Sequence, residues 1–142
     1  MSRAERKNMS VLKRFQSKSD VEFMNTAHEL EKFTILAVKQ IPKTYTFTLK
    51  VPLCESARKI NQYIRYANSI YPVRNRDDFE TLKEMRRNYQ RLARIELENF
   101  FELLRITSEI VPLKNLETWV GYAVREIDLL KSWVESDKSR YK

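Results

Sequence analysis

The sequence predicts an all-α protein, an antiparallel up-and-down four-helix bundle. Three observations favour this fold class. One glycine and four prolines in 142 residues leave few positions for the tight turns that a sheet protein needs. Apolar residues recur every three or four positions in four successive segments. The connections between these segments are short, which favours neighbouring helices that run in opposite directions.

A basic segment precedes the first predicted helix. Residues 1–19 contain six Lys or Arg against one Glu and show little periodicity. Such a composition is typical of a terminal tail that is disordered or loosely docked. We therefore expect a basic tail over residues 1–19, followed by a single helical bundle domain over residues 20–142.

The first two predicted helices are delimited by prolines. The first runs from about residue 20 to residue 40 and ends before Pro42, because the residue before a proline is pushed out of the α region. Its inward stripe is Phe23, Ala27, Leu30, Thr34, Ala37 and Ile41. The second starts near Pro52, which suits a first helical turn, and ends before Pro72. Its stripe is Leu53, Ala57, Ile60, Ile64, Ala67 and Tyr71.

The third predicted helix is the longest, from about residue 76 to residue 110, with Asn75 or Asp77 as its cap. Its inward side chains are Leu82, Met85, Tyr89, Ala93, Leu97, Phe100 and Leu104. The fourth follows Pro112 and runs to about residue 136. Its inward side chains are Leu116, Val120, Ala123, Ile127, Leu130 and Val134.

The decapeptide IPKTYTFTLK, at residues 41–50, alternates polar and apolar residues in the manner of a half-buried strand. Predicted helices flank it on both sides, and a lone strand would leave its backbone groups unpaired. We therefore interpret it as a connector between the first two helices. Tyr45, Phe47 or Leu49 is expected to pack against the end of the bundle.

The charge of the chain points to an anionic partner. The net charge is +8 and the pI is about 9.6, which favours a nucleic acid, an anionic membrane surface or an acidic protein. Residues 45–76 hold six Lys or Arg against one acid, whereas residues 77–111 hold six against eight. Ion pairs on a solvent-exposed face therefore explain the charged residues of the third helix as well as a binding site for an anionic partner does. Tyr63 is expected to flank the core. Tyr66 is a candidate either for packing within the protein or for stacking on a base.

Apolar side chains outside the predicted core predict self-association. Apolar residues lie outside the inward stripes of the first and fourth helices, and a monomer would leave them in water. We expect a homo-oligomer that buries them. The candidate interface residues are Ile35, Leu36, Tyr122, Leu129 and Trp133.

Catalysis has little support in the sequence. His28 is the only histidine, which excludes a site with several histidines, and a single glycine excludes a Gly-rich phosphate loop. Cys54 is interpreted as a small apolar helix residue, and Glu96 as an acid that pairs within the bundle or at an interface. We expect no enzyme activity, no cofactor and no metal. No apolar run is long enough for a membrane span, so a cytoplasmic protein is expected.

Three stretches of the sequence carry a resemblance to a known family: the IPK...F.L junction, the following helix VPLCESARKINQYIRYANSIY, and LLKSWV in the last helix. Together they resemble the accessory variability determinant (Avd) proteins of diversity-generating retroelements. They are also similar to small four-helix proteins encoded by intervening sequences in bacterial large-subunit ribosomal RNA genes. The resemblance covers about residues 20–136.

The resemblance implies a homopentameric, basic barrel of four-helix bundles. It also implies binding to RNA and DNA with little sequence preference, and to a reverse transcriptase whose mutagenic retrohoming the protein supports. The candidate nucleic-acid or polymerase contacts are Arg58, Lys59, Arg65, Arg74, Arg76, Arg86, Arg87, Arg91 and Arg94. The alternative is a structural or protein-interaction bundle of the ribosomal intervening-sequence type, in which the basic charge is incidental.

Overall fold

The computed structural model describes residues 2–13 and 21–142; most of these residues are helical, and none of them is in a β-strand. The predicted all-α class is thereby confirmed. The helices are α1 (Arg3–Lys13), α2 (Val21–Ala37), α3 (Val51–Asn68), α4 (Phe79–Ile110) and α5 (Leu116–Arg140).

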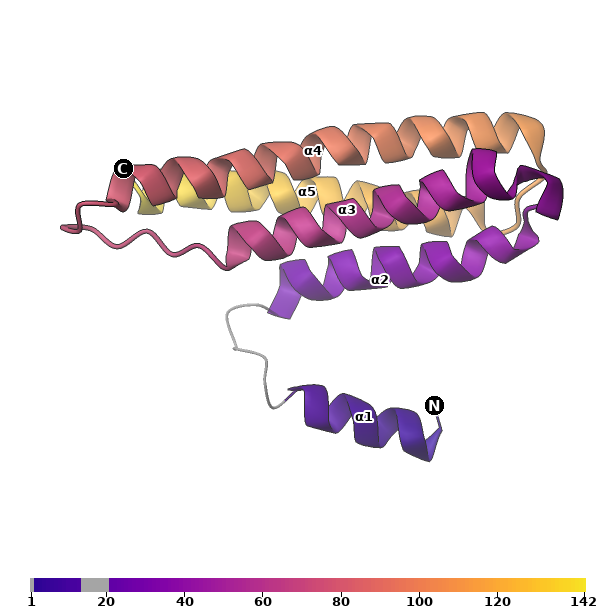
Figure 1. The fold of residues 1–142 in the computed structure, drawn as a ribbon, viewed down its shortest axis with the longest axis horizontal. Helices are drawn as coiled ribbons and strands as arrows, with labels where there is room; N and C mark the ends of the chain where they lie inside the picture. Colours follow the sequence, from indigo (N-terminus) through magenta and orange to yellow (C-terminus); the bar gives the residue numbers. More distant parts are fainter. Residues whose placement is uncertain (1, 14–20) are drawn as a thin grey trace.

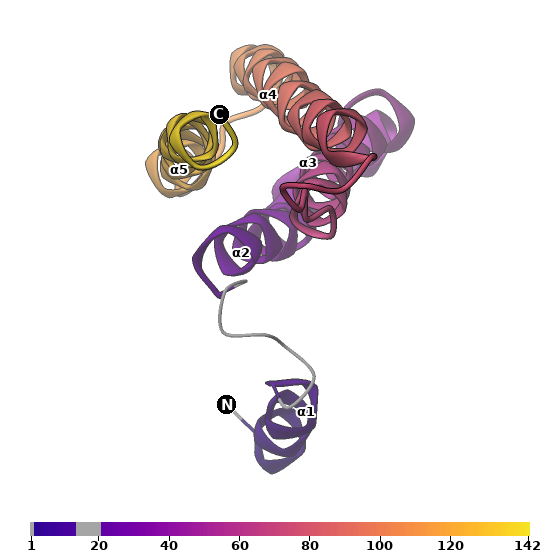
Figure 2. The ribbon, with the colours of Figure 1, turned by 90° about the vertical axis from the view of Figure 1, so that its left-hand side faces the viewer.

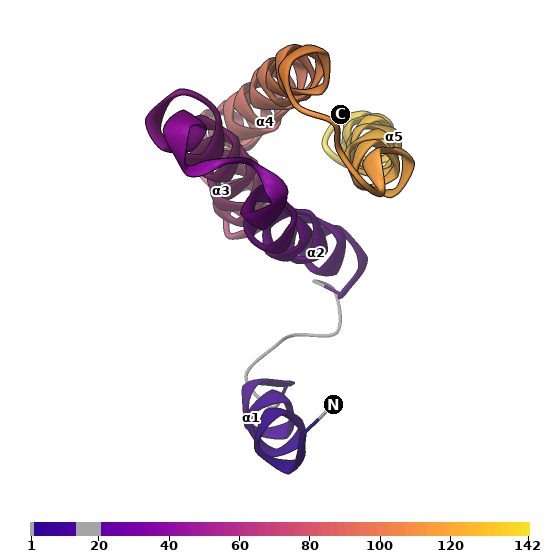
Figure 3. The same ribbon diagram turned by 90° about the vertical axis from the view of Figure 1, so that its right-hand side faces the viewer.

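The four long helices lie side by side as a helical bundle (Figure 1). Helix α3 packs most extensively on α4, while α2 packs on both α3 and α5, and α4 on α5. Seen from either end, the four helices are arranged around a common centre (Figures 2 and 3). Each long helix therefore turns one side to the core and another to the surroundings.

The first part of the predicted tail contains a helix. Residues Arg3–Lys13 form helix α1. The side-chain oxygen of Ser2 accepts a hydrogen bond from the backbone N–H of Glu5 at 3.1 Å, as an N-terminal helix cap does. The sequence Ser2-Arg3-Ala4-Glu5 matches a capping box, a local signal for a helix start. Residues 14–19 of the predicted tail lie outside the described residues.

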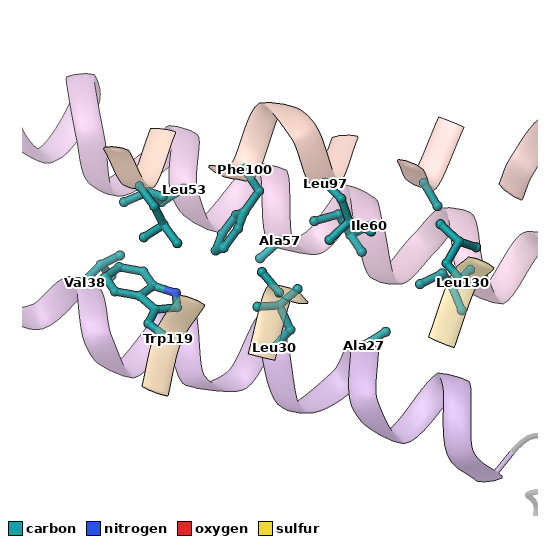
Figure 4. Packing of buried hydrophobic residues seen from close by; sticks show 14 of the residues in the cluster. Ala27, Leu30, Val38, Leu53, Ala57, Ile60, Leu97, Phe100, Trp119 and Leu130 are labelled. Carbon is teal, nitrogen blue, oxygen red and sulfur yellow. The ribbon is translucent and has the colours of Figure 1, made fainter. Parts of the chain in front are cut away.

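Apolar side chains from α2, α3, α4 and α5 fill the core (Figure 4). Trp119 and Phe100 are the largest fully buried side chains. The Trp119 indole N–H donates to the hydroxyl oxygen of Thr34 at 3.0 Å, and that hydroxyl donates to the carbonyl of Leu30 at 2.8 Å. Polar groups at this end of the core are therefore satisfied, as burial requires.

The predicted inward faces of α4 and α5 are confirmed in part: Ala93, Leu97, Phe100, Leu104, Ala123 and Leu130 are buried as expected, but polar side chains share these faces. On α4, Arg86 and Gln90 are buried, whereas the predicted inward residue Met85 is exposed. On α5, the buried side chains are Trp119, Ala123, Glu126, Leu130, Trp133 and Asp137. Val120, Ile127 and Val134, which were predicted to face inward, are only partly buried. The buried face of each helix therefore overlaps the predicted stripe but also extends to polar positions beside it.

The decapeptide connects α2 to α3 as predicted, but it is helical. A 3₁₀ turn over Lys43–Tyr45 and a π-helical turn over Thr46–Lys50 lead directly into α3. Leu49 is buried and Tyr45 packs against the core, whereas Phe47 is 84% exposed. The strand-like alternation is therefore wrong as secondary structure, and Phe47 does not cover the end of the bundle.

Two asparagines with positive φ mark the other connections. Asn75, at φ 72°, lies between α3 and α4, and Asn115, at φ 60°, directly precedes α5. Asparagine tolerates the left-handed region better than most residues, so it can serve where glycine is scarce. Helix α4 begins at Phe79, and neither Asn75 nor Asp77 is its cap residue.

A buried ion pair joins α4 to the C-terminal end of α5, beyond the predicted end of this helix. The Arg86 Nε donates to Asp137 Oδ2 at 2.6 Å and Nη2 donates to Asp137 Oδ1 at 3.1 Å. Gln90 donates to the same carboxylate at 2.8 Å, and Arg86 Nη1 donates to the Ile70 carbonyl at 2.9 Å. This contact fixes the rotation of both helices because both side chains are buried.

We predict that Asp137→Asn destabilises the fold by about 3 kcal/mol, because it leaves the buried Arg86 without a compensating charge. Glu135→Gln is the matched control. Its carboxylate pairs with Lys138 in an exposed i,i+3 contact, and it should change the free energy of unfolding by less than about 0.5 kcal/mol. Urea denaturation followed by circular dichroism measures both. Equal stability of the two variants would contradict the role given to this ion pair.

Candidate nucleic-acid interface

The cations predicted on the second helix lie on the outer side of α3. Arg58, Lys59 and Arg65 are all exposed, together with Gln62 between them. Arg58 forms an ion pair with Glu31 of α2, with 3.1 Å between Nε and Oε2. Among the described residues, Lys59 and Arg65 are in no ion pair, so two of the three positive charges are not offset. These residues form the α3 strip: Arg58, Lys59, Gln62 and Arg65.

Hydrogen bonds hold part of the α3 strip in place. Asn61 donates from Nδ2 to Glu31 Oε1 at 2.9 Å, and its Oδ1 accepts from Arg65 Nε at 3.2 Å. Glu31 therefore organises two arginines, directly at Arg58 and through Asn61 at Arg65. Because one guanidinium edge of each is held, the remaining N–H groups are oriented to bind phosphate.

A groove of about 590 Å³ runs beside the α3 strip, between α2 and α3. His28, Glu31, Lys32, Ile35 and Leu36 line its α2 side. Its α3 side is lined by Arg58, Asn61, Gln62 and Arg65. Ile35 and Leu36, predicted as oligomer contacts, are exposed, so this groove combines two apolar side chains with polar and charged ones.

The tyrosines near the α3 strip have different surroundings. Tyr63 is partly buried against the core, as expected, and stacks on Tyr89 with 6.5 Å between ring centroids. Tyr66 is 48% exposed and meets Tyr89 edge-on at 5.4 Å. Tyr66 therefore presents part of its ring to solvent beside the strip, where a base could stack.

Arg86 is not a surface contact, which corrects its place among the candidates. Arg86 is 3% exposed and forms an ion pair with Asp137, so no phosphate can reach it without disrupting the core. Its guanidinium also lies over the rings of Trp133, at 5.0 Å, and Tyr141, at 5.4 Å. The prediction failed because the acid that binds Arg86 lies 51 residues further along the chain.

The other three predicted α4 arginines lie at the surface, and two of them pair with carboxylates of the same helix. Arg91 pairs with Glu84 at 3.1 Å and Arg94 with Glu98 at 3.8 Å. Arg87, Arg91 and Arg94 line a groove of about 460 Å³ between α4 and α5. The α5 side of this groove adds Lys131 and Lys138, which the sequence did not single out because the helix pairing was unknown. This groove shares no lining residue with the α2–α3 groove.

Arg74 and Arg76 lie in the connection between α3 and α4. Arg74 Nη2 donates to the backbone carbonyl of Arg140 at 2.8 Å, which ties the connection to the end of α5. Arg76 is exposed and lies 3.6 Å from the carboxylate of Asp78. Both arginines are therefore at the end of the bundle, apart from the α3 strip.

The predicted interface residues on α5 are covered within one chain to different extents. Trp133 is buried, so its assignment to an oligomer interface is wrong. Tyr122 packs on Phe33 of α2, with 5.0 Å between ring centroids, and Leu129 is partly buried. The packing of α5 against α2 and α4 accounts for these side chains.

The side chains most capable of chemistry are dispersed. Among the described residues, no group of His, Cys, Asp and Glu is arranged to hold a metal ion. Burial raises the pKa of the Cys54 thiol, and Arg58 only partly offsets this. The Glu96 carboxylate accepts hydrogen bonds from Ser56 and Asn99, each at 2.7 Å. Within the described chain, no helix is long and apolar enough to cross a bilayer.

Glu126 is a buried acid that the sequence did not reveal. It is fully buried on α5, and neither carboxylate oxygen has a hydrogen-bond partner in the described structure. Burial raises the pKa of Glu126 to about 8, against a smaller opposing effect of Arg125. The folded protein therefore holds Glu126 in its neutral form at pH 7.

We predict that Glu126 makes the fold less stable as pH rises from about 4.5 to about 8. Because the pKa is raised in the folded state, the stabilisation is complete below the unfolded pKa and is lost as pH rises. At pH 7 the cost is on the order of 3 kcal/mol. Glu126→Gln should gain stability over the wild type, by more at pH 7 than at pH 5, in urea titrations. A constant difference between the two proteins would contradict this assignment.

Comparison with known proteins does not assign the chain to a family. No family model matches the sequence, and neither a curated protein nor a solved structure matches it. A functional assignment for this chain must therefore come from its residues, its surfaces and the resemblance carried by its sequence.

Proposed function

We propose that this chain is a non-enzymatic nucleic-acid-binding accessory protein of a diversity-generating retroelement, folded as an antiparallel four-helix bundle. In this role it binds template RNA or complementary DNA and the element's reverse transcriptase, and thereby supports mutagenic retrohoming. The polymerase and the retroelement come from the resemblance to Avd proteins. The nucleic-acid contact also has support in the chemistry of the surface.

The α3 strip is the observation that carries the proposal. Helix α3 has three basic residues and one acid, whereas α4 has six of each. The strip is exposed, Lys59 and Arg65 are in no ion pair with any residue that the structure describes, and Tyr66 lies beside them. Positive charge that is not neutralised locally, next to an accessible ring, suits an unstacked single strand.

The expected mechanism is neutralisation of phosphate charge with release of counterions. Each phosphate contact lowers the slope of log affinity against log salt by roughly 0.9 on duplex DNA and roughly 0.7 on a single strand. Arg58, Lys59 and Arg65 lie along about two helical turns, so they can follow a backbone without reading its bases. Binding should therefore show little sequence preference.

A protein-interaction bundle of the ribosomal intervening-sequence type is the second candidate function. The observation that favours it is the exposure of large apolar side chains on α4, among them Ile95 and Ile110. In that case the basic charge is incidental. A pull-down would then recover a protein partner after nuclease treatment.

We predict that the triple variant Arg58→Glu, Lys59→Glu and Arg65→Glu weakens binding to all RNA and DNA sequences alike. The dependence of log affinity on log salt should weaken by the contribution of about three phosphate contacts, because each of the three cations meets one phosphate. Filter binding at several salt concentrations measures this change. Circular dichroism should show unchanged helical content, because all three side chains are exposed.

The matched control reverses three other exposed cations, Lys39, Arg105 and Arg125. Both triple variants lower the net charge from +8 to +2, because each reversal removes two positive charges. The control should retain most of the affinity. Equal losses in the two variants would mean that total charge, and not the α3 strip, drives binding. Salt-insensitive binding by the wild type would reject the mechanism.

A further inference from the structure

His28, the only histidine of the chain, lines the groove between α2 and α3. The two helices pack side by side (Figure 1), and the α3 wall of the groove consists of Arg58, Asn61, Gln62 and Arg65. The His28 side chain is exposed on the α2 wall. Its imidazole therefore lies at the same groove as two arginines of the α3 strip.

The charges that line this groove are mostly positive. They are those of Lys32, Arg58 and Arg65, together with the negative charge of Glu31. The groove thus has a net charge of +2 while His28 is neutral and +3 when His28 is protonated. Glu29, the next residue after His28, is not among the lining residues, and no described residue of α5 lines the groove either.

Glu31, the acid of this groove, is already bound by α3. Its Oε2 lies 3.1 Å from Arg58 Nε, and its Oε1 accepts a hydrogen bond from Asn61 Nδ2 at 2.9 Å. His28 forms no ion pair or hydrogen bond with another side chain of the described structure. The carboxylate of the groove therefore leaves the imidazole without an acidic partner, and an external anion can supply one.

We propose that His28, in its protonated form, is a further phosphate contact in the α2–α3 groove, so that nucleic-acid binding there takes up a proton. An imidazolium donates hydrogen bonds from both ring nitrogens, and such a bond is strong when the acceptor is a charged phosphate oxygen. Histidine ordinarily changes its charge between about pH 5 and pH 8. Proton and nucleic acid then raise each other's affinity, since coupling between two ligands is reciprocal.

This contact gives the nucleic-acid site two walls, and it rests on the proposed function. Arg58 and Arg65 lie on the α3 wall, and His28 and Lys32 lie on the α2 wall. Lysine and arginine keep their charge at neutral and mildly acidic pH, so His28 is the lining residue whose positive charge varies there. Affinity should therefore depend on pH as well as on salt.

The probe for the test is an oligouridylate without a terminal phosphate, because neither its bases nor its phosphodiesters change charge in the range used. The wild type should bind it about tenfold more tightly at about pH 5.5 than at about pH 8, which is the effect of one hydrogen bond between charged groups. The slope of log affinity against log salt should be steeper by roughly 0.7 at the lower pH. His28→Gln should bind with the same affinity and slope at both pH values. Filter binding measures all of these quantities.

Lys32→Gln is the matched control, because Lys32 is exposed and lies about one helical turn from His28 in the same groove. It should weaken binding at both pH values and retain the pH dependence. Isothermal titration calorimetry in two buffers of different ionisation enthalpy should show proton uptake by the wild type and none by His28→Gln. Glu126, which also titrates near this range, is buried in the core and is present in every variant.

The outcomes separate this inference from the proposed function. Salt-sensitive binding without a pH dependence, or with a pH dependence that His28→Gln retains, would overturn the role of His28 and leave the proposed function intact. If the wild type shows no salt-sensitive binding at either pH, the proposed function is rejected and the role of His28 with it. Circular dichroism at both pH values establishes that each variant is folded.

Discussion

The buried guanidinium of Arg86 is the interaction on which the arrangement of the bundle depends. It joins Asp137 near the end of α5 to the Ile70 carbonyl just beyond α3, and it lies over the ring of Trp133. A buried arginine must have its donors satisfied and its charge balanced, so alternatives that rotate α4 or α5 are costly. The ion pair therefore favours the observed rotation of both helices.

The same constraint explains which parts of the fold were predictable. Helix existence and approximate ends follow from local signals, namely apolar spacing and the prolines at positions 42, 72 and 112. The rotation of α4 and α5 depends on a contact between distant residues. Both helices carry apolar residues on more than one side, so periodicity placed Ile127 inward where the structure buries Glu126. An unpaired buried acid contradicts the pattern on which such predictions rest.

The candidate sites were predictable to the extent that exposure follows from one helix alone. Arg58, Lys59 and Arg65 lie opposite the apolar stripe of α3, so their exposure could be inferred from angle, and the structure agrees. Arg86 and Trp133 could not be assigned in this way, because each covers the other across two helices. The contribution of α5 to the α4–α5 groove likewise required the pairing of helices.

The distribution of charge then separates the surfaces by partner. An α-helix with balanced acids and bases offers a polyanion little net attraction along its length. Helix α4 has six of each, and its Arg91 and Arg94 pair with carboxylates of the same helix. On α3, Arg58 pairs with Glu31, whereas Lys59 and Arg65 are in no ion pair among the described residues. Because these two charges are not offset locally, α3 is better suited than α4 to meet the phosphates of a nucleic acid.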